Sequence, residues 1–288
     1  MTGVPVTPAR RPGRVSTGLL WLAVIHLTLP GALAAQPERI RARPPVALDV
    51  AVENGADVWS RADGTGYAND VVRAAFRAGG VEPHLIVVPY SRCKAMVIAA
   101  VVPACVSMSH DRSIPPSIVF ADSANFTFQS DFYQNVDHPL AGGADGQLAR
   151  GTVVGVVRGY EYPDTIRRLA ARGVIRLVAA SSEVVNLRKL ADGRLDAVML
   201  NTDEIKRGDD LIARAGVAER VAFASHGGSL PAFIGFNVRH PRGAEALARY
   251  NAGRRLIAQN GELADIKRRW ADSIRVAPRA SRAVPAHP

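Results

Sequence analysis

Cysteine is scarce in this sequence, and its scarcity excludes several kinds of site. Only Cys93 and Cys105 occur among the 288 residues. Two thiols make a poor metal site, because structural zinc sites take four ligands. The C-x-x-C spacing that is typical of redox motifs is also absent. We therefore expect no metal site and no cofactor.

Long apolar runs are absent apart from one near the N-terminus. Residues Gly18–Leu29 are mostly apolar but too few to span a bilayer, which takes about 20 residues. Three arginines precede this run, and Ala32–Ala34 follows it with the small-x-small pattern of a cleavage site. We predict a cleaved signal peptide over residues 1–34 and export to the periplasm; a buried helix or an uncleaved anchor is the alternative. The residue directly after the predicted cleavage site is alanine and not cysteine, so a lipid anchor is not indicated.

Acidic residues are outnumbered, and the formal net charge is +10. The predicted signal peptide contains three arginines and no acidic residue, which leaves +7 on the rest of the chain. A basic balance can indicate nucleic-acid binding, but the charges are scattered and no helix-turn-helix or zinc pattern occurs. We expect no nucleic-acid partner and interpret the charge as a basic solvated surface. Residues 273–288, rich in Pro, Ala and Arg, are predicted to form a disordered basic tail.

The two cysteines would share an oxidising compartment after export. An even number of cysteines there favours one disulfide, here between Cys93 and Cys105. The loop between them is short, so the bond would contribute about 2–3 kcal/mol to stability. We predict a structural disulfide, with a redox role as the less favoured alternative.

Strand and helix patterns alternate from about Pro45 to Trp270, which predicts an α/β fold with parallel sheets. Strands are expected over 46–52, 84–90, 104–109, 152–157, 174–179 and 194–201. Helices are expected over 66–80, 92–100 and 181–193, with a further helix that ends at Gly173. One long helical stretch is expected over 244–270, with Leu247, Tyr250, Leu256 and Ile257 on its buried face. The two halves resemble each other, which indicates two lobes with a cleft in which ligands bind beyond the carboxyl ends of the strands.

Six stretches, in order, carry a family resemblance. They are "DGTGYANDVV", "VPYSRCKAMV", "SMSHDR", "VGVVRGYEY", "LADGRLDAVMLN" and "NAGRRLIAQNGELADIKRRW". In this order and spacing they resemble the family 3 extracellular solute-binding proteins, the periplasmic receptors of amino-acid ABC transporters.

The resemblance implies a two-lobed periplasmic-binding-protein type II fold whose lobes are joined by two crossover strands. Lobe 1 would hold residues 35–126 and 239–272, and lobe 2 residues 127–238. The implied protein is a monomer that captures a small, carboxylate-bearing ligand between its lobes. Its implied protein partner is the permease of a membrane transporter.

The stretch Cys105–Arg112, "CVSMSHDR", is the first candidate for ligand binding. Ser107, Ser109 and Arg112 would lie at the end of a lobe 1 strand. The planar guanidinium of Arg112 matches a carboxylate, and the resemblance makes this arginine the clamp on the ligand's carboxylate. A surface salt bridge is the alternative role for Arg112.

Two further candidates come from lobe 2. Gly159 and Tyr160 would offer backbone N–H groups at a helix start, where anions bind readily; alternatively, Tyr160 stacks on the ligand. Asn201 stands where the family often has an acidic residue that holds the ligand's ammonium. A ligand without a free α-amino group is therefore an open possibility.

The remaining candidates are four residues of lobe 1. Trp59 and Tyr90 could contact the ligand or pack in the core. Arg92 beside Arg112 would make the pocket cationic and would favour anionic ligands. Glu53 could bind a cationic group, or it could be an ordinary surface carboxylate.

Three functions are consistent with these features. The leading hypothesis is a binding protein without catalytic residues. The second is an enzyme on the same fold, such as a cyclohexadienyl dehydratase-like lyase, with Glu53 or Glu161 as a general acid. The third is an accessory subunit of a periplasmic complex.

Overall fold

The computed structural model of the chain describes residues 46–140 and 148–276. The predicted signal peptide and residues 277–288 of the predicted tail lie outside the described residues. In the described part, helix α7 continues to Val276. No helix there is both long and apolar enough to cross a membrane.

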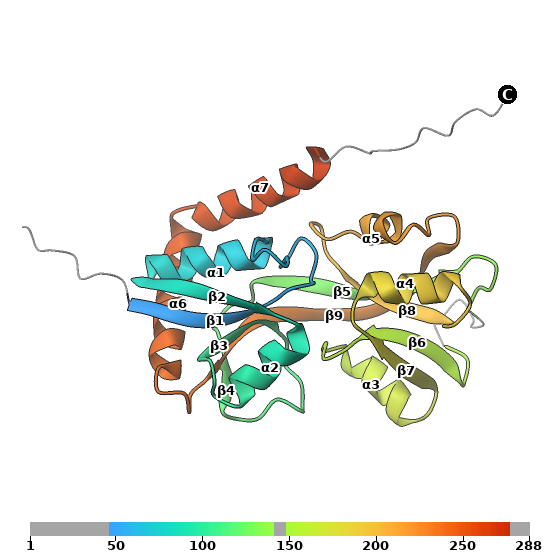
Figure 1. Cartoon of the computed structure of the whole chain (residues 1–288), viewed down its shortest axis with the longest axis horizontal. Helices are drawn as coiled ribbons and strands as arrows, with labels where there is room; N and C mark the ends of the chain where they lie inside the picture. Colours follow the sequence, from blue (N-terminus) through green and yellow to red (C-terminus); the bar gives the residue numbers. More distant parts are fainter. Residues whose placement is uncertain (1–45, 141–147, 277–288) are drawn as a thin grey trace, which may run out of the picture. The chain divides into compact units, whose positions relative to one another are not determined.

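Helices and strands alternate through most of the described chain (Figure 1). The strands are β1 Val46–Glu53, β2 Val81–Val88, β3 Ala104–Met108, β4 Ile118–Phe120, β5 Phe126–Asn135, β6 Thr152–Val157, β7 Ile175–Ala180, β8 Ala197–Thr202 and β9 Val221–Asn237. The helices are α1 Tyr67–Ala78, α2 Tyr90–Ile98, α3 Asp164–Ala171, α4 Glu183–Ala191, α5 Gly208–Ala215, α6 Gly243–Gln259 and α7 Glu262–Val276.

The strand order divides the elements into two lobes. The order is β2-β1-β3-β9-β5-β8-β6-β7, and β4 also pairs with β9. Strand β1 pairs in parallel with β2 and β3, and β6 pairs in parallel with β7 and β8. We call β1–β4 with α1, α2, α6 and α7 the first lobe, and β6–β8 with α3, α4 and α5 the second lobe.

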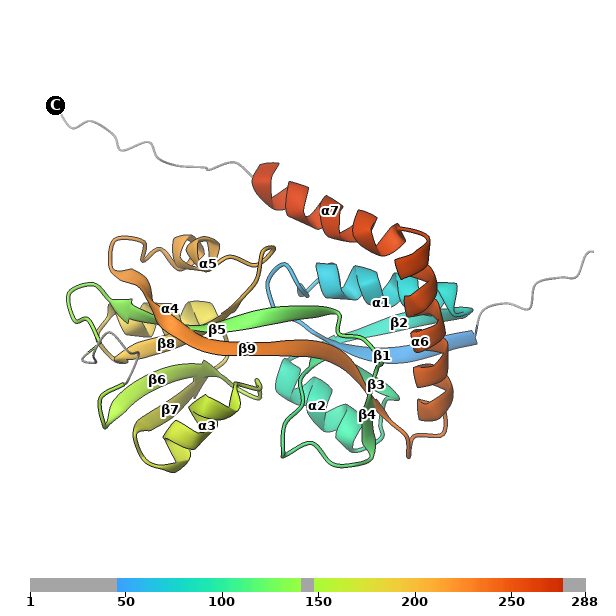
Figure 2. The same ribbon diagram turned by 180° about the vertical axis from the view of Figure 1, so that it is seen from behind.

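Two long strands connect the lobes. Strand β9 has 17 residues; its first part pairs with β5, and its last part pairs with β3 and β4. Strand β5 pairs with β8 as well as with β9. Figure 2 shows β9 as a continuous ribbon with β5 beside it. The predicted α/β class, with two lobes and two crossover strands, is confirmed, whereas the residue boundaries drawn at 126 and 238 stay a prediction.

Helix α1 covers the first lobe with the face that its sequence predicts. Val71, Val72, Ala75 and Phe76 are fully buried, because they recur at the three- and four-residue spacing of one helix face. On the opposite side of the sheet, α2 is attached to β3 by the disulfide between Cys93 and Cys105, whose Cα atoms are 5.6 Å apart. The disulfide predicted from the cysteine count is therefore present.

Helices α1 and α6 approach each other closely at two glycines. A Cβ atom on Gly253 of α6 would lie 1.8 Å from the carbonyl oxygen of Ala75, and one on Gly79 would lie 2.3 Å from the carbonyl oxygen of Arg249. Beside this contact the rings of Phe76 and Tyr250 pack with centroids 5.2 Å apart. The aromatic pair therefore depends on the absence of a side chain at Gly253.

The long C-terminal helix predicted over 244–270 is wrong, because the structure breaks it into α6 and α7. Gly261 has φ +87°, a conformation that side chains disfavour, and the Oδ1 atom of Asn260 accepts a hydrogen bond from the N–H of Glu262 at 3.0 Å. The turn redirects the chain, and Leu256, predicted to be buried, is 49% exposed. The Asn-Gly pair in the sequence was the available signal for this break.

We expect Gly253→Ala to lower the free energy of unfolding by about 1–3 kcal/mol, because the new methyl group would push α6 away from α1. Urea unfolding measures the effect. Gly55→Ala is the matched control, since its added Cβ meets no atom within 4 Å, and it should stay within about 0.5 kcal/mol. Equal effects of the two substitutions would contradict the role given to the close contact.

Candidate functional site

A small cavity lies where the two lobes meet. Six of the residues predicted to bind ligand line it: Glu53, Trp59, Tyr90, Ser107, Tyr160 and Asn201. Ala56, Phe126, Phe128 and Glu161 complete the lining. The lining comes from strand ends and the loops that follow them, because parallel strands bring their carboxyl ends to one edge of a sheet.

The cavity is nearly filled by the protein's own side chains. Its volume is about 20 Å³, which is close to the space that one water molecule requires, about 10–15 Å³ on the same measure. The lobes therefore lie closed against each other in this structure, and a solute could enter only if they separated.

Two tyrosine–glutamate pairs cross between the lobes in opposite directions. The hydroxyl of Tyr90, at the start of α2, donates to Oε2 of Glu161 in the second lobe at 2.6 Å. The hydroxyl of Tyr160, after β6, donates to Oε1 of Glu53 in the first lobe, also at 2.6 Å. The two tyrosine rings are nearly perpendicular, with centroids 5.3 Å apart. Each lobe therefore supplies one donor and one acceptor to the other.

A lysine from the first lobe adds a charge to one of these pairs. Lys94 Nζ lies 2.8 Å from Glu161 Oε1 and donates to the carbonyl oxygen of Gly159 at 3.1 Å. Both side chains of this ion pair are largely buried. Lys94 lies one turn after Tyr90 on α2, so one helix supplies both contacts to Glu161.

The turn after β8 contacts Trp59 from the second lobe. Asp203 Oδ2 accepts a hydrogen bond from the indole Nε1 of Trp59 at 2.9 Å, and the Nζ of Lys206 lies 4.3 Å from the centre of the indole ring. Asp203 Oδ1 also accepts from the backbone N–H groups of Ile205 and Lys206, which holds the turn in place. Trp59 thus makes a hydrogen bond with its edge and a cation–π contact with its face.

Lys206 is fully buried, and Glu183 supplies the counter-charge to its ammonium group. Its Nζ lies 2.5 Å from Glu183 Oε2, in an ion pair that is not aligned as a hydrogen bond. Glu183 begins α4, and its Oε1 accepts the backbone N–H of Asn201 at 2.8 Å. The acidic first turn of α4 is favoured by the helix dipole, and Ser182 caps the same helix by accepting from Val185 N–H.

Burial changes the acidities of the groups at this interface. Burial raises the pKa of Glu53 to about 7, although the hydrogen bond from Tyr160 and the charge of Lys206 oppose the shift. Burial also raises the pKa of Glu161, against the opposing effect of Lys94, and the pKa of Asp203, against its hydrogen bonds from Lys206 and Ile205 N–H.

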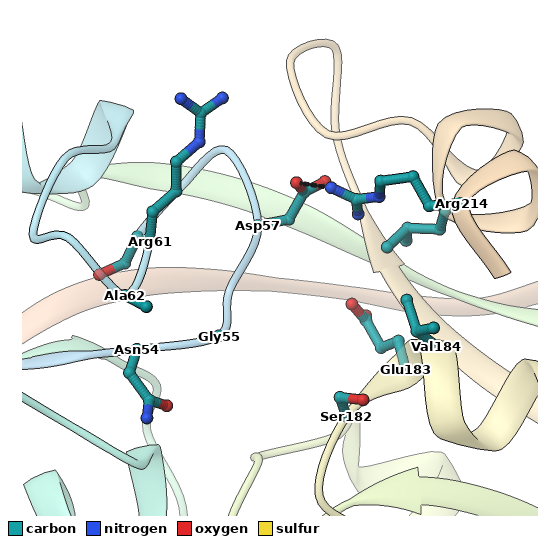
Figure 3. Close-up of a pocket in the computed structure, with 11 residues that line it drawn as sticks. Asn54, Gly55, Asp57, Arg61, Ala62, Ser182, Glu183, Val184 and Arg214 are labelled. Atoms are coloured by element: carbon teal, nitrogen blue, oxygen red, sulfur yellow. Dashed lines mark hydrogen bonds and ion pairs between the residues drawn. The ribbon is translucent and has the colours of Figure 1, made fainter.

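Ion pairs reinforce the lobe contact around the cavity. Arg214 of α5 pairs with Asp57 of the loop after β1, as Figure 3 shows beside a surface pocket with a volume of about 330 Å³. Arg167 of α3 pairs with Asp111. In both pairs the aspartate is largely buried and the arginine is partly exposed, so these pairs add to the buried contacts of the interface.

The structure places both candidate arginines outside the cavity. Arg92 and Arg112 are exposed, and neither is among the residues that line the cavity. Arg112 follows β3 by four residues, and the turn at Asp111–Ile114, in which Ser113 N–H donates to Asp111, carries it towards solvent. Arg112 therefore does not line this cavity, and its role as the carboxylate clamp stays a prediction.

The predicted ligand-binding residues Ser109, Asn201 and Ser107 differ in their hydrogen bonds. Ser109 donates to the carbonyl oxygen of Pro231 at 2.8 Å, so it ties β3 to β9. Asn201 accepts from Ser130 Oγ at 2.8 Å. The Oγ of Ser107 is buried without a hydrogen-bond partner, and its backbone has φ +65°. A non-glycine residue in this conformation is held there by its surroundings, which is common at functional sites.

Several important residues were not singled out from the sequence. Lys94, Glu183 and Lys206 are charged yet buried, and nothing in their local pattern distinguishes them from surface residues. Phe126 and Phe128 carried a weak signal, because residues two apart on a strand face the same side. Both of these rings pack around Trp59, with centroids at 4.4 and 5.9 Å.

Comparison with solved structures identifies the fold. The chain is similar to a histidine kinase sensor domain that resembles periplasmic binding proteins (TM-score 0.65, 18% identity, covering 79% of this chain and 97% of that chain). It is also similar to an ancestral arginine-binding protein (TM-score 0.62, 15% identity, covering 79% of this chain and 99% of that chain). A third similar structure is ArtJ, an arginine-, lysine-, histidine-binding protein from Geobacillus stearothermophilus (TM-score 0.62, 15% identity, covering 78% of this chain and 94% of that chain). No family model and no curated protein sequence matches the chain. The chain thus has the two-lobed periplasmic-binding-protein type II fold.

We expect Lys206→Met to lower the free energy of unfolding by about 3–5 kcal/mol, because it leaves Glu183 buried without a counter-charge. Adding Glu183→Gln should restore part of the loss, since the amide oxygen can still accept from Asn201. Lys267→Met is the matched control: its ion pair with Glu204 is exposed and should contribute no more than about 1 kcal/mol. Urea unfolding of these three variants and of Glu183→Gln alone tests this, and additive losses in the double variant would contradict the pairing.

We expect Glu53→Gln to gain stability relative to the wild type as the pH rises. The folded pKa of Glu53, about 7, exceeds the ordinary value of 4.5, so its stabilising contribution is complete below pH 4.5 and is lost as the pH rises through 7. Between pH 5 and pH 8 the free energy of unfolding of Glu53→Gln should rise by about 2–3 kcal/mol relative to that of the wild type. Tyr160→Phe should extend the loss to higher pH, because it removes a hydrogen bond that lowers this pKa. Parallel stability curves in urea unfolding would refute the assignment.

Proposed function

We propose that this protein binds a small solute between its two lobes and releases it to a membrane transporter. One observation carries the proposal: predicted ligand-binding residues from both lobes converge on a single buried cavity at the carboxyl ends of the strands. A few convergent polar groups with shifted pKa values are typical of ligand sites. The fold supports the same function, since neighbours are described as binding arginine or, for ArtJ, arginine, lysine and histidine.

Binding requires the lobes to separate and close again. The hydrogen bonds Tyr90–Glu161 and Tyr160–Glu53 join the two lobes across the cavity. A solute must therefore replace these contacts with better ones, and its apparent affinity is reduced by the fraction of molecules that are closed. The crossover strands β5 and β9 are the only strand connections between the lobes in the described chain, so we place the hinge there.

Delivery to a transporter follows from the predicted export of the chain. A signal peptide over residues 1–34 would release a periplasmic monomer of residues 35–288. A two-lobed protein of this kind presents one surface when it is open and another when it is closed, which allows a permease to recognise the loaded form. The permease itself is inferred from the family resemblance.

An enzyme is the second candidate function, and Glu53 is the observation that favours it. A carboxyl group with a pKa of about 7 remains partly protonated at neutral pH and can act as a general acid. One neighbour is described as an amino-acid-binding precursor of cyclohexadienyl dehydratase. Incubation with prephenate or arogenate tests this candidate: product formation that Glu53→Gln abolishes would support it over a binding protein.

Tryptophan fluorescence can detect binding, because Trp59 lies in the cavity wall. In residues 35–288 the only other tryptophan is Trp270, so Trp270→Phe leaves Trp59 as the sole reporter. A solute at a hundredfold its Kd should add about 2.7 kcal/mol to stability and should change the Trp59 emission. A panel of amino acids, dicarboxylates, aromatic acids and amines is the first screen.

The control measurement is the radius of gyration in solution. A true ligand should change the distribution between open and closed lobes, which small-angle scattering detects, and should be recovered unchanged. If no solute in a broad panel alters stability, emission or scattering, the proposed function fails, and a role as accessory subunit becomes the better hypothesis.

A further inference from the structure

The cavity between the lobes carries acidic and aromatic groups without a basic one. Glu53 and Glu161 are its two ionisable acids, and none of its ten lining residues is lysine, arginine or histidine. A carboxylate placed there would face two carboxyl groups in surroundings of low dielectric constant, where like charges repel strongly. The cavity chemistry therefore disfavours an anionic ligand.

The buried acids around the cavity outnumber the buried bases. The carboxyl groups are those of Glu53, Glu161, Glu183 and Asp203, and the ammonium groups are those of Lys94 and Lys206. Lys94 pairs with Glu161, and Lys206 pairs with Glu183. In the described part of the chain Glu53 forms no ion pair, and its side chain accepts one hydrogen bond, from the neutral hydroxyl of Tyr160. Glu53 is thus a buried acid that lacks a counter-cation.

The other groups of the lining are suited to a cation. The rings of Tyr90 and Tyr160 meet at nearly right angles beside Glu53, and aromatic faces attract cations by their quadrupoles. The Oγ of Ser107 is buried without a partner and can accept an N–H. Lys206 shows that an ammonium is accommodated against the same wall, since its Nζ lies over the face of Trp59.

We propose that the cavity binds a small organic ammonium ion that carries no carboxylate, with Glu53 as its counter-ion. The proposal rests on the proposed solute-binding function and specifies its ligand class. When the lobes separate, the Tyr160–Glu53 bond breaks and Glu53 becomes free to accept the N–H or face the methyl groups of the ammonium. When they close again, Tyr90 and Tyr160 cover the cation and Ser107 takes a remaining N–H.

The test compares matched probes by isothermal titration calorimetry on residues 35–288. Ethanolammonium and choline are the cations, 3,3-dimethyl-1-butanol is the neutral isostere of choline, and glycine betaine adds a carboxylate to the same head group. We expect at least one of the two cations to bind, and its Kd to be at least about tenfold lower than that of the neutral or carboxylate-bearing probe, since a buried charge-assisted contact is worth about 1.5–3 kcal/mol.

Two variants identify the counter-ion. Glu53→Gln keeps the shape of the side chain and removes its charge, so it should raise the Kd of the bound cation about tenfold or more. Tyr160→Phe keeps the ring and removes the internal donor that competes for Glu53, so it should lower the Kd several-fold. Glu245→Gln is the charge control on exposed α6 and should change the Kd less than about twofold. Opposite effects at positions 53 and 160 cannot arise from general loss of structure.

The outcomes separate the ligand class from the function. Binding of glycine betaine, other carboxylates or amino acids without binding of either cation overturns the ligand class and leaves the proposed function intact. Equal affinity for choline and its neutral isostere, or an unchanged Kd in Glu53→Gln, also overturns it. If neither these probes nor the broad panel bind or move the lobes, both proposals fail.

Discussion

Buried carboxyl groups at the lobe interface determine how this structure is held closed. An ionised acid without a partner is costly in a protein interior, so each one must find a donor. Glu53 and Glu161 find theirs across the interface in Tyr160 and Tyr90. In the closed arrangement each lobe donates a tyrosine hydroxyl to the buried carboxyl group of the other. The position of the helices, the disulfide and the crossover strands all serve to bring these donors and acceptors together.

This arrangement also explains why the cavity is small and selective. Direct contacts between the lobes occupy the space in which a solute would bind. A solute competes with internal tyrosine hydroxyls, and it succeeds only if it offers Glu53 a stronger partner than a neutral donor. A cation does so, because charge-assisted hydrogen bonds are about twice as strong as neutral ones. Selectivity would then arise from the charge of the ligand more than from its shape.

Sequence patterns predicted much of the fold, and their failures have local physical reasons. The helix predicted over 66–80 is present as α1, because its apolar residues recur at helical spacing, and the disulfide was predicted because the chain has two cysteines. The continuous helix predicted over 244–270 was wrong because Asn260 and Gly261 form a turn, in which Gly261 has φ +87°. The family resemblance made Arg112 the carboxylate clamp; the turn after β3 leaves its side chain exposed, and this role stays a prediction.

The sequence by itself determined the α/β class, the two lobes, and six of the residues that now line one cavity. The class and the lobes depend on periodicity and on the order of the strands, which are local properties of the chain. The six residues were singled out mainly by their places in the motifs of the resembling family, and their role in binding stays a prediction. Only the tertiary structure decided the electrical character of the cavity. Burial turned Lys94, Lys206 and Glu183 from apparent surface residues into internal ion pairs and left Glu53 without a cation. The Lys206–Glu183 pair joins different elements of the second lobe, and the hydrogen bonds between the lobes join residues 71 and 107 positions apart. No local pattern reports such contacts.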